Sequence, residues 1–378
     1  MDVVKFGVIG TGAVWAYHRL GSKNNPKIKF VSAYDIDETK LKKAAKYAKF
    51  DVYSNLDQFF KSDIDAVLIL VPHFLHRDMV IAAAEAGKHV LCEKPMAPTL
   101  EECDEMISAT RKAGVKFMIA ENHRFLPVHE YMKNIIERGF IGDIFYGRTY
   151  EGAYVTPGEF LDPTRWNFTF DKAGGGVVAD QGVHKFTLLN WLLGDLHSAY
   201  CWLGKAMPSP PNKGEDTAIE LLRYKNGAMI TVDLSSITIH PLTNRTELHG
   251  TKGTLLEDHA WENPLQIFST HPEAEVKGEF YSPSIEHGPF PQYYKISMSH
   301  EDAYFAECII KDKKPTFTPE QAKEGVAVVL LSYLSAKNGT VATMDELMRI
   351  YNTSGTKSIF QGLESAIKIN NEQMKWEL

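Results

Sequence analysis

Two segments of the sequence carry side chains that can exchange protons. The first is Glu93-Lys94-Pro95, at the end of a short apolar run that begins at His89. A lysine at the carboxyl end of a buried parallel strand faces the crevice in which open sheets bind ligands. Its ammonium group can lose hydration there and become a proton donor or acceptor. In isolation, these residues also fit a strand end followed by a solvated turn.

The second segment places a carboxylate and an imidazole four residues apart. Gly174-Gly175-Gly176 leads into an apolar helical pattern that contains Asp180 and His184 and continues to Gly194. Side chains at this spacing project from one face of a helix. An imidazole titrates near neutral pH, and a neighbouring carboxylate stabilises its protonated form. The pair predicts an acid/base unit, although the spacing also fits a structural charge pair or half of a metal site.

A glycine turn near the N-terminus predicts a phosphate site. Residues 3–9 read as an apolar strand that opens directly into Gly10-Thr11-Gly12-Ala13-Val14-Trp15. The two glycines allow a tight turn and a close approach of the backbone to a pyrophosphate at the N-terminus of the next helix. The third motif position calls for Gly or Ala, yet Trp15 stands there. Either the helix stands off from the strand, or the indole points into the cofactor cleft.

Asp35 ends a second predicted strand, residues 30–34, about 20 residues beyond the turn, where an acidic side chain accepts hydrogen bonds from the adenosine ribose. A carboxylate repels a 2′-phosphate and no arginine follows, so we expect NAD rather than NADP. The alternative for Asp35 is a turn or helix cap beside Asp37. A third apolar run, residues 66–71, ends at Pro72-His73, which we expect near the nicotinamide, while His76 fits a helix start. The two histidines lack a clear third ligand nearby, and we expect no metal.

The composition is that of a globular protein with two domains. The chain has 378 residues, 44% of them hydrophobic and 24% charged. Its net charge of -7, without a basic tract, argues against nucleic acid or an anionic membrane as partner. The four cysteines show no paired CxxC spacing, which predicts reduced thiols and a cytoplasmic location.

The order of elements predicts two kinds of sheet. Strands and helices alternate through residues 1–125, which demands a doubly wound parallel sheet. Residues 126–378 change to strands with period-two alternation, including a hairpin through Asn226-Gly227 that fits a primed turn. An antiparallel sheet of this kind often offers its open face to a partner subunit. Residues 260–300 are predicted to form a long ordered loop and residues 320–337 a helix, and the tail from Ile350 carries no readable role.

Taken in this order, the motifs resemble the Gfo/Idh/MocA oxidoreductase family. The resemblance implies an N-terminal Rossmann domain, a C-terminal α/β domain with a large open, mostly antiparallel sheet, a nicotinamide cofactor, and a sugar or polyol substrate. It also implies catalytic roles for Lys94, Asp180 and His184 and a cis Lys94-Pro95 bond. Trp15 and His73 depart from the family pattern. Expected cofactor contacts are Gly10, Gly12, Ala13, Val14, Trp15, Asp35, Pro72, His73, His76, Glu93, Lys94 and Asn122; expected substrate contacts are Lys94, Arg124, Arg165, Trp166, Asp180 and His184.

The resulting hypothesis is NAD-dependent oxidation of a secondary hydroxyl on a sugar, glycoside or cyclitol, possible in both directions. Lys94 and His184 both remain open as the formal base. Arg165 and Trp166 are candidate sugar contacts, equally well explained as a surface salt link and a core aromatic. The aromatic residues between positions 261 and 294 suggest an aryl glycoside, and the resemblance to sugar 3-oxidising members of the family implies oxidation at carbon 3. The rival functions are an NAD-dependent glycosidase and a non-catalytic sensor. We expect a homodimer or homotetramer formed through the C-terminal sheet.

Overall fold

The computed structural model describes residues 2–239, 244–259 and 261–369. The chain divides into two compact units, which we call the dinucleotide unit and the sheet unit. The dinucleotide unit consists of residues 1–97, 102–126 and 291–323, and the sheet unit contains the remainder. A division at residue 125 is therefore too simple, because residues 291–323 return to the dinucleotide unit.

A six-stranded parallel sheet forms the centre of the dinucleotide unit. Its strand order, β3-β2-β1-β4-β5-β6, is the doubly wound order of dinucleotide-binding folds. Every residue of β4 is buried, as expected for a strand covered on both faces. The strands are β1 (Val4–Ile9), β2 (Ile28–Tyr34), β3 (Asp51–Tyr53), β4 (Ala66–Ile69), β5 (His89–Glu93) and β6 (Phe117–Ala120).

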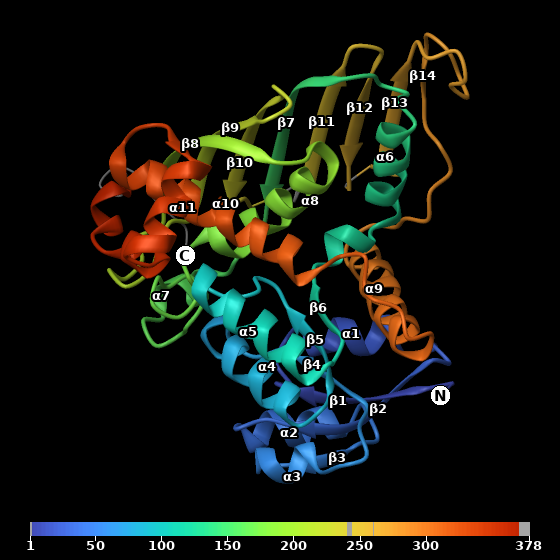
Figure 1. Ribbon diagram of the computed structural model, residues 1–378, viewed down its shortest axis with the longest axis vertical. Helices are drawn as coiled ribbons and strands as arrows, with labels where there is room; N and C mark the ends of the chain where they lie inside the picture. The colour runs from blue at the N-terminus through green and yellow to red at the C-terminus, as the bar shows by residue number, and fades with distance from the viewer. Residues whose placement is uncertain (1, 240–243, 260, 370–378) are drawn as a thin grey trace. The chain divides into compact units, whose positions relative to one another are not determined.

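Helices cover this sheet (Figure 1). The long helix α9 packs against α1 and against the first two strands, and the Phe6 and Phe305 rings lie 6.4 Å apart. The late segment thus completes the core of the N-terminal sheet. The helices of this unit are α1 (Trp15–Gly21), α2 (Glu38–Ala45), α3 (Leu56–Phe60), α4 (His76–Glu85), α9 (Gln292–Ile310) and most of α5 (Leu100–Ala113).

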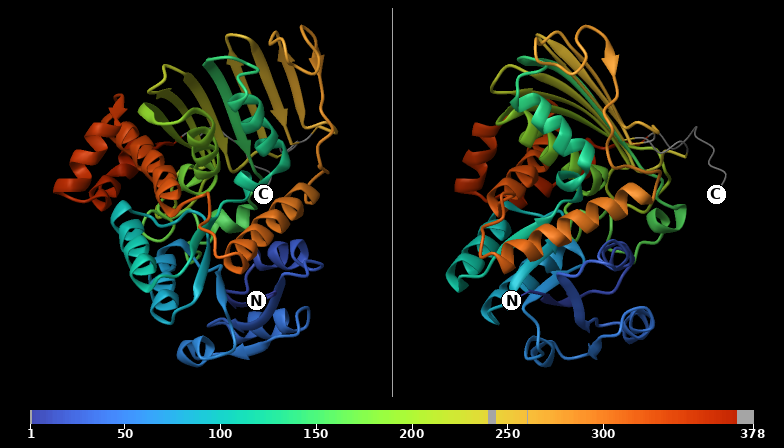
Figure 2. Two further views of the ribbon diagram at one scale, coloured as in Figure 1. Left: turned by 45° about the vertical axis from the view of Figure 1, so that its right-hand side comes forward. Right: turned by 90° about the vertical axis from the view of Figure 1, so that its right-hand side faces the viewer.

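The sheet unit contains a ten-stranded, mostly antiparallel sheet. Its order is β14-β13-β12-β11-β7-β10-β9-β8-β15, with β16 beside β8, and β7 runs parallel to β10. Helices α6 and α8 lie on one face of the sheet (Figure 2). The strands are β7 (Ile144–Gly152), β8 (Leu196–Lys205), β9 (Thr217–Tyr224), β10 (Met229–Ser235), β11 (Asn244–Gly250), β12 (Gly253–Asp258), β13 (Leu265–Ser269), β14 (Phe280–Tyr281), β15 (Ala342–Thr343) and β16 (Lys368–Ile369); the remaining helices are α6 (Pro127–Glu137), α7 (Pro157–Leu161), α8 (Val183–Leu193), α10 (Pro319–Asn338) and α11 (Met344–Thr353).

Two expectations for this half of the chain need correction. Residues 261–300 are not one loop, because they contain β13, β14 and the start of α9. The tail forms α11 and further short elements up to residue 369, and its last residues, 370–378, lie outside the described residues. The β9–β10 hairpin forms as predicted, but only Gly227 has a positive φ, of 95°. A primed type I′ turn needs two such residues, so the connection is a three-residue loop with glycine in the left-handed position.

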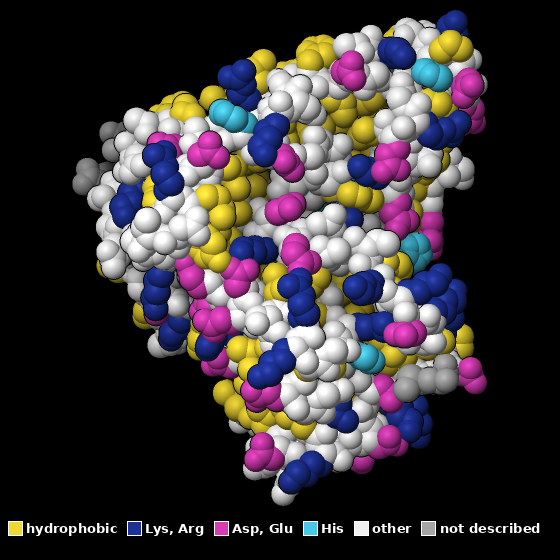
Figure 3. All heavy atoms as spheres, viewed as in Figure 1, with side chains coloured by type: hydrophobic (Ala, Val, Ile, Leu, Met, Phe, Trp, Pro, Cys, Tyr) yellow, Lys and Arg dark blue, Asp and Glu magenta, His cyan; other side chains and the backbone are white. Residues whose placement is uncertain are grey.

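The surface charges, the cysteines and the helices each bear on the expectations from composition. Acidic and basic side chains are interspersed over the face shown in Figure 3. All four cysteines are free and buried, in agreement with the predicted reduced thiols. Among the helices that the structure describes, none is long and apolar enough to cross a membrane.

Strand β9 buries a carboxyl group beneath the sheet. Ala218, Glu220 and Leu222 point inward, whereas Ile219 and Leu221 are exposed. Burial raises the pKa of Glu220 to about 8, although Ser332 of α10 donates a hydrogen bond of 2.7 Å to it. The carboxyl group is therefore mostly neutral at pH 7, which avoids the cost of a buried charge.

The Glu220→Gln variant should change how stability depends on pH. Between pH 4.5 and about 8 the unfolded carboxyl is ionised while the folded one stays protonated, so rising pH destabilises the wild type. In the variant, the free energy of unfolding should therefore fall less steeply with rising pH, by about 1.4 kcal/mol per pH unit in that window. Urea unfolding of both proteins at a series of pH values measures the difference. Parallel pH dependences would show that Glu220 ionises freely in the folded protein.

Candidate dinucleotide and proton-transfer sites

Glycine is required at the first position of the turn after β1. Gly10 has a φ of 92°, and a Cβ atom there would lie 2.6 Å from the carbonyl oxygen of Leu70. A Cβ atom on Gly12 would meet no atom within 4 Å. The protein thus leaves open space beside Gly12, which suits the close approach of a pyrophosphate.

Asp35 holds the glycine turn in place. One carboxylate oxygen accepts hydrogen bonds from the backbone nitrogen and the hydroxyl of Thr11, both at 2.8 Å. The other accepts the backbone nitrogen of Asp37 at 2.9 Å, and Asp37 in turn caps α2. Asp35 therefore does have the structural turn role that we considered as an alternative to ribose binding. A carboxylate has about four acceptor sites, so these three bonds leave capacity for a ribose hydroxyl.

The indole of Trp15 belongs to the core. Trp15 is 4% exposed, and its ring lies edge-on to Phe30 at 4.8 Å and 5.9 Å from Phe50. The side chain is therefore turned toward β2 and the loop before β3. The expectation that this indole points into a cofactor cleft is wrong, and a cofactor contact at this position would have to come from the backbone.

The Lys94-Pro95 bond after β5 is cis, as the family resemblance implied. His76, which begins α4 as predicted, lies beneath this segment and is fully buried. Its Nδ1 is 2.9 Å from the carbonyl oxygen of Pro95, and its Nε2 is 3.0 Å from that of Val71. Burial lowers the pKa of His76 and so favours its neutral form, which has one N–H group and can donate to only one of these two carbonyl oxygens. Both nitrogens face the protein backbone, and the cofactor contact expected of this side chain stays a prediction.

His73 and Pro72 lie at the carboxyl end of β4. His73 begins a short 3₁₀ turn that Pro72 precedes, and its ring is 5.6 Å from that of His76. Strands β1 and β4 are neighbours, although they are separated in the chain by β2 and β3. Ligands bind at such a switch point in open sheets, so His73 and Pro72 keep their place as candidate cofactor contacts.

Asn122 and Arg124 follow β6 in a 3₁₀ turn and contact the returning segment. The Asn122 amide donates a hydrogen bond of 3.0 Å to Ser297 of α9. The Arg124 guanidinium lies 4.8 Å from the centre of the Phe317 ring, and Arg124 is 8% exposed. Both side chains therefore help to hold residues 291–323 in the dinucleotide unit. Their contacts with cofactor and substrate remain predictions.

In the sheet unit, the glycine run is fixed by its neighbours. A Cβ atom on Gly175 would lie 1.7 Å from the Tyr333 hydroxyl, and one on Gly176 would lie 2.0 Å from the carbonyl oxygen of Glu215. The Glu215 carboxylate accepts hydrogen bonds from Gly176 and Val178 nitrogens at 3.1 Å and from Tyr333 at 2.8 Å. The run can therefore pass close to Glu215 only because it has no side chains.

The helix after this run begins with a π-helical turn, Val178–Gly182, before α8. Asp180 lies in this turn and is partly exposed, whereas His184 is buried in the first turn of α8. The sequence predicted a regular helix here. Single π turns inside α-helices are frequent at functional sites, because the extra residue re-aims the side chains around it. Lys185, next to His184, is fully buried and lies 3.3 Å from Glu151 of β7.

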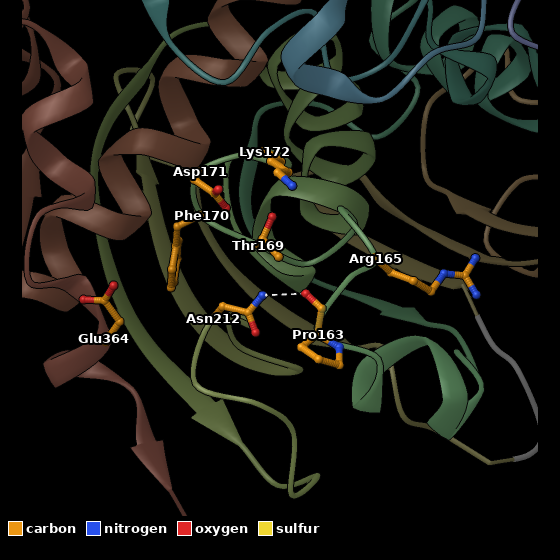
Figure 4. A pocket seen from close by; sticks show the side chains of 8 residues that line it. All are labelled: Pro163, Arg165, Thr169, Phe170, Asp171, Lys172, Asn212 and Glu364. Carbon is orange, nitrogen blue, oxygen red and sulfur yellow. Dashed lines mark hydrogen bonds between the residues drawn. The ribbon is translucent and has the colours of Figure 1, made fainter. Parts of the chain in front are cut away.

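Arg165 and Trp166 lie in the loop between α7 and the glycine run. Arg165 is exposed and Trp166 is partly buried. Lys213, which the sequence analysis missed, is 1% exposed and donates hydrogen bonds to the backbone oxygens of Arg165 and Asn167, at 2.8 and 2.9 Å. Arg165 extends away from the other labelled side chains in Figure 4. A hollow of about 250 Å³ in this region is lined by Pro163, Arg165, Thr169, Phe170, Asp171, Lys172, Asn212 and Glu364.

Among the residues that the structure describes, two buried groups of side chains could hold a metal by their spacing, and neither was anticipated from the sequence. In the sheet unit the group is His129, Glu257 and His259, where burial lowers the pKa of His129. Glu257 raises the pKa of His259 against the effect of burial. The charges in and around this group are balanced, because a protonated His259 lies beside Glu257 and Lys185 lies beside Glu151. A divalent ion would upset that balance, so we interpret the group as an ion-pair network.

The second group is His18, Glu301 and Asp302 in the dinucleotide unit. Both ring nitrogens of His18 already face carboxylate oxygens, at 2.9 Å (Asp302) and 3.1 Å (Glu93). The ring has no lone pair left for a metal. No motif connects His18, Glu93 and Asp302 in the sequence, because they lie on three elements, α1, β5 and α9, that only the fold brings together.

The two glycines of the turn should differ in their effects when mutated. Gly12→Ala should leave folding intact, because its Cβ meets no protein atom, but should raise the dissociation constant for NADH at least about tenfold, or 1.4 kcal/mol. Gly10→Ala should destabilise the fold itself by about 1–2 kcal/mol for its positive φ alone. NADH fluorescence titration and thermal unfolding separate the two effects. Unchanged NADH affinity in Gly12→Ala would place the pyrophosphate elsewhere.

Comparison with known proteins agrees with this architecture. Residues 4–121 match a family of oxidoreductases with the NAD-binding Rossmann fold, and residues 129–256 match the GFO/IDH/MocA C-terminal domain. The solved structure of a levoglucosan dehydrogenase in complex with NADH and levoglucosan covers 90% of this chain and 99% of its own, with a TM-score of 0.81 and 23% identity. This likeness supports the fold.

Relatives with assigned activities include sugar and cyclitol dehydrogenases. The myo-inositol 2-dehydrogenase of Thermotoga maritima is 25% identical over 340 residues, which cover 89% of this chain and 96% of that protein. The NAD(+)-dependent scyllo-inositol 2-dehydrogenase of Bacillus subtilis is 26% identical over 351 residues, with 90% and 96% covered. The open turn at Gly12 fits NAD, which is the cofactor. The chain belongs to the Gfo/Idh/MocA family of NAD-dependent oxidoreductases.

Proposed function

We propose that the protein oxidises a secondary hydroxyl of a sugar, glycoside or cyclitol to a ketone, and that the reaction can run in reverse. The observation that carries the proposal is the place of Lys94, at the carboxyl end of β5, in the sheet whose first strand opens into the dinucleotide turn. Ligands of doubly wound sheets bind at this edge. The acid/base pair Asp180 and His184, on a π turn and α8, supports the same chemistry.

Each of the three side chains has a distinct role in the proposed reaction. Bound NAD supplies the hydride acceptor at its nicotinamide ring. As the carbinol C–H bond breaks, His184 takes the hydroxyl proton and Asp180 stabilises the imidazolium that results. The Lys94 ammonium donates a hydrogen bond to the oxygen on which negative charge develops. An exchange of roles, with Lys94 as the base, satisfies the same proton balance.

The finer substrate preference is also a proposal. Arg124 and Arg165 could donate hydrogen bonds to sugar hydroxyls, and the indole of Trp166 could stack on a sugar ring. Phe280 and Phe290 are each more than half exposed, which suits an aryl glycoside oxidised at carbon 3. The free, buried cysteines support our proposal of a cytoplasmic location.

Lys94→Ala should lower the turnover number by about a hundredfold to ten-thousandfold, the usual range for a lost proton-transfer group. Levoglucosan, myo-inositol, scyllo-inositol and aryl glucosides serve as test substrates, with NADH absorbance and product mass as readouts. Lys112→Ala, on the exposed last turn of α5, is the matched control and should turn over normally. Full activity in Lys94→Ala would remove the catalytic assignment. Glycoside cleavage without net NADH would identify the rival glycosidase.

A second copy of this chain is the partner that we propose for the exposed face of the large sheet. Trp202, Ile219, Leu221 and Met229 are each 47–58% exposed, and their strands β8, β9 and β10 are adjacent. Trp202 pairs with Ile219 across the β8–β9 ladder, so the apolar side chains form one patch. A twofold axis through such a patch makes it self-complementary.

The double variant Ile219→Lys/Leu221→Lys should be monomeric at concentrations at which the wild type is a dimer or tetramer, because it places two charges in an apolar interface. Sedimentation velocity measures the particle mass. Ile36→Lys, at an 84% exposed apolar position of the dinucleotide unit, is the control and should leave the mass unchanged. A wild type that is itself monomeric contradicts the proposal.

A further inference from the structure

A fully buried histidine connects three elements of the dinucleotide unit. His18 lies on α1, in the helix that follows the glycine turn, and is 0% exposed. Its Nδ1 is 2.9 Å from an oxygen of Asp302 on α9, and its Nε2 is 3.1 Å from an oxygen of Glu93 at the end of β5. One ring therefore joins the helix of the cofactor turn to the strand that carries Lys94.

The partners of this ring require it to be a cation. An ionised carboxylate only accepts hydrogen bonds, so both ring nitrogens must donate, and only the imidazolium form has two N–H groups. Burial opposes the charge, yet Asp302 and Glu93 outweigh it and raise the pKa of His18 well above its usual value. The ring is thus a rigid donor with two fixed directions.

The second oxygen of each carboxylate extends the contact. Glu93 Oε2 accepts the backbone N–H of Lys94 at 3.1 Å. Asp302 Oδ2 accepts a hydrogen bond from the hydroxyl of Ser22, the residue that follows α1 as its C-cap, at 2.6 Å. Glu93 therefore links the His18 ring to the backbone of Lys94, because one carboxylate oxygen contacts the ring and the other accepts the Lys94 N–H.

His76 holds the same segment from the other side, since its Nδ1 lies 2.9 Å from the carbonyl oxygen of Pro95. The residue pair Lys94-Pro95 is thus bonded at its N–H group by Glu93, and its carbonyl group lies against the buried His76 ring. The Lys94 side chain starts between these two fixed points. His76 is neutral, so the charge at this position resides on His18.

A further acidic side chain, Glu301, lies close to His18 and affects the charges around it. Glu301, on α9, is fully buried, and burial raises its pKa well above the usual value. The positive charge of His18 opposes this rise, while Glu93, Asp302 and Glu121 reinforce it. Burial thus favours the neutral form of Glu301, and the carboxyl groups that contact the two nitrogens of the His18 ring are those of Asp302 and Glu93.

We propose that His18 is a positioning residue for Lys94: by bridging Asp302 and Glu93, it fixes the backbone from which the Lys94 side chain projects. The inference rests on the catalytic role proposed above for Lys94. Loss of the bridge frees Glu93, moves the Lys94 backbone and displaces the ammonium group. A shift of about 1 Å at a catalytic group can cost about a hundredfold in rate.

Two variants of His18 separate this role from general stability. The amide nitrogen of Gln can take the place of the ring Nε2, which faces Glu93, whereas that of Asn can take the place of Nδ1, which faces Asp302. With the best substrate of the panel, His18→Asn should lower the turnover number about tenfold to a hundredfold. His18→Gln should retain most of the activity, even if both variants melt at similar temperatures. Equal losses in both variants, in proportion to their melting temperatures, overturn the proposal.

A double variant tests whether the effect passes through Lys94. In the Lys94→Ala background, His18→Asn should cause no further loss of turnover, because the group that it positions is already gone. A further loss of tenfold or more overturns the proposal. Normal turnover in Lys94→Ala alone is a failure of the proposed function and leaves the structural test below in force.

Crystal structures supply a readout that does not depend on any substrate. In His18→Asn, the Glu93 carboxylate should turn away and the bond between Lys94 N and Glu93 Oε2 should be lost, with a shift of the Lys94 ammonium relative to wild type. His18→Gln should keep both. If His18→Asn does not fold, Glu93→Ala replaces it, since it removes the same support and leaves His18 paired with Asp302. Lys94 unmoved in the variant examined overturns the proposal.

Discussion

The two-sided contact of His18 with Glu93 and Asp302 is the interaction on which the geometry of the dinucleotide unit depends. A buried carboxylate is costly unless a cation and hydrogen bonds compensate it. Here one imidazolium compensates two carboxylates that come from β5 and α9. The same contact thus satisfies an electrostatic requirement and ties the end of β5, next to Lys94, to α1 and α9.

In the sheet unit, uncharged hydrogen-bond donors surround a buried carboxyl group, that of Glu215. The glycine run passes Glu215 so closely that the backbone N–H groups of Gly176 and Val178 donate to that carboxylate, and Tyr333 donates a third bond. Burial still raises the pKa of Glu215 to about 7. The missing side chains at Gly175 and Gly176 make this approach possible, and the π turn that bears Asp180 begins immediately afterwards.

The sequence predicts the parts of this molecule that depend on local patterns. The alternation of apolar strands and amphipathic helices gave the parallel sheet, and Asn226-Gly227 gave the β9–β10 hairpin. Prediction from the sequence failed where the contacts that decide the structure join residues far apart in the chain. The indole of Trp15 is turned inward because Phe30 and Phe50 form a place for it, which no spacing rule contains.

The candidate site shows the same limit. Residue types and order identified Lys94, Asp180 and His184 as proton-transfer candidates, but the environment of each depends on partners elsewhere. His76 was expected at the cofactor, and no local pattern indicated that its two ring nitrogens face backbone carbonyl groups that only folding brings to it. The π turn was not predicted either, because an inserted helical residue leaves no clear mark in the periodicity of a short apolar helix.

The return of residues 291–323 to the N-terminal sheet has a consequence for the order of folding during synthesis. Phe305 packs against Phe6 of β1, and Asp302 is one of the two anions around His18. A nascent chain that has emerged only as far as residue 290 contains all six strands of the first sheet but not the helix that covers them. The first unit to leave the ribosome is therefore unable to complete its core until most of the second has been translated, which couples the maturation of the two units in time.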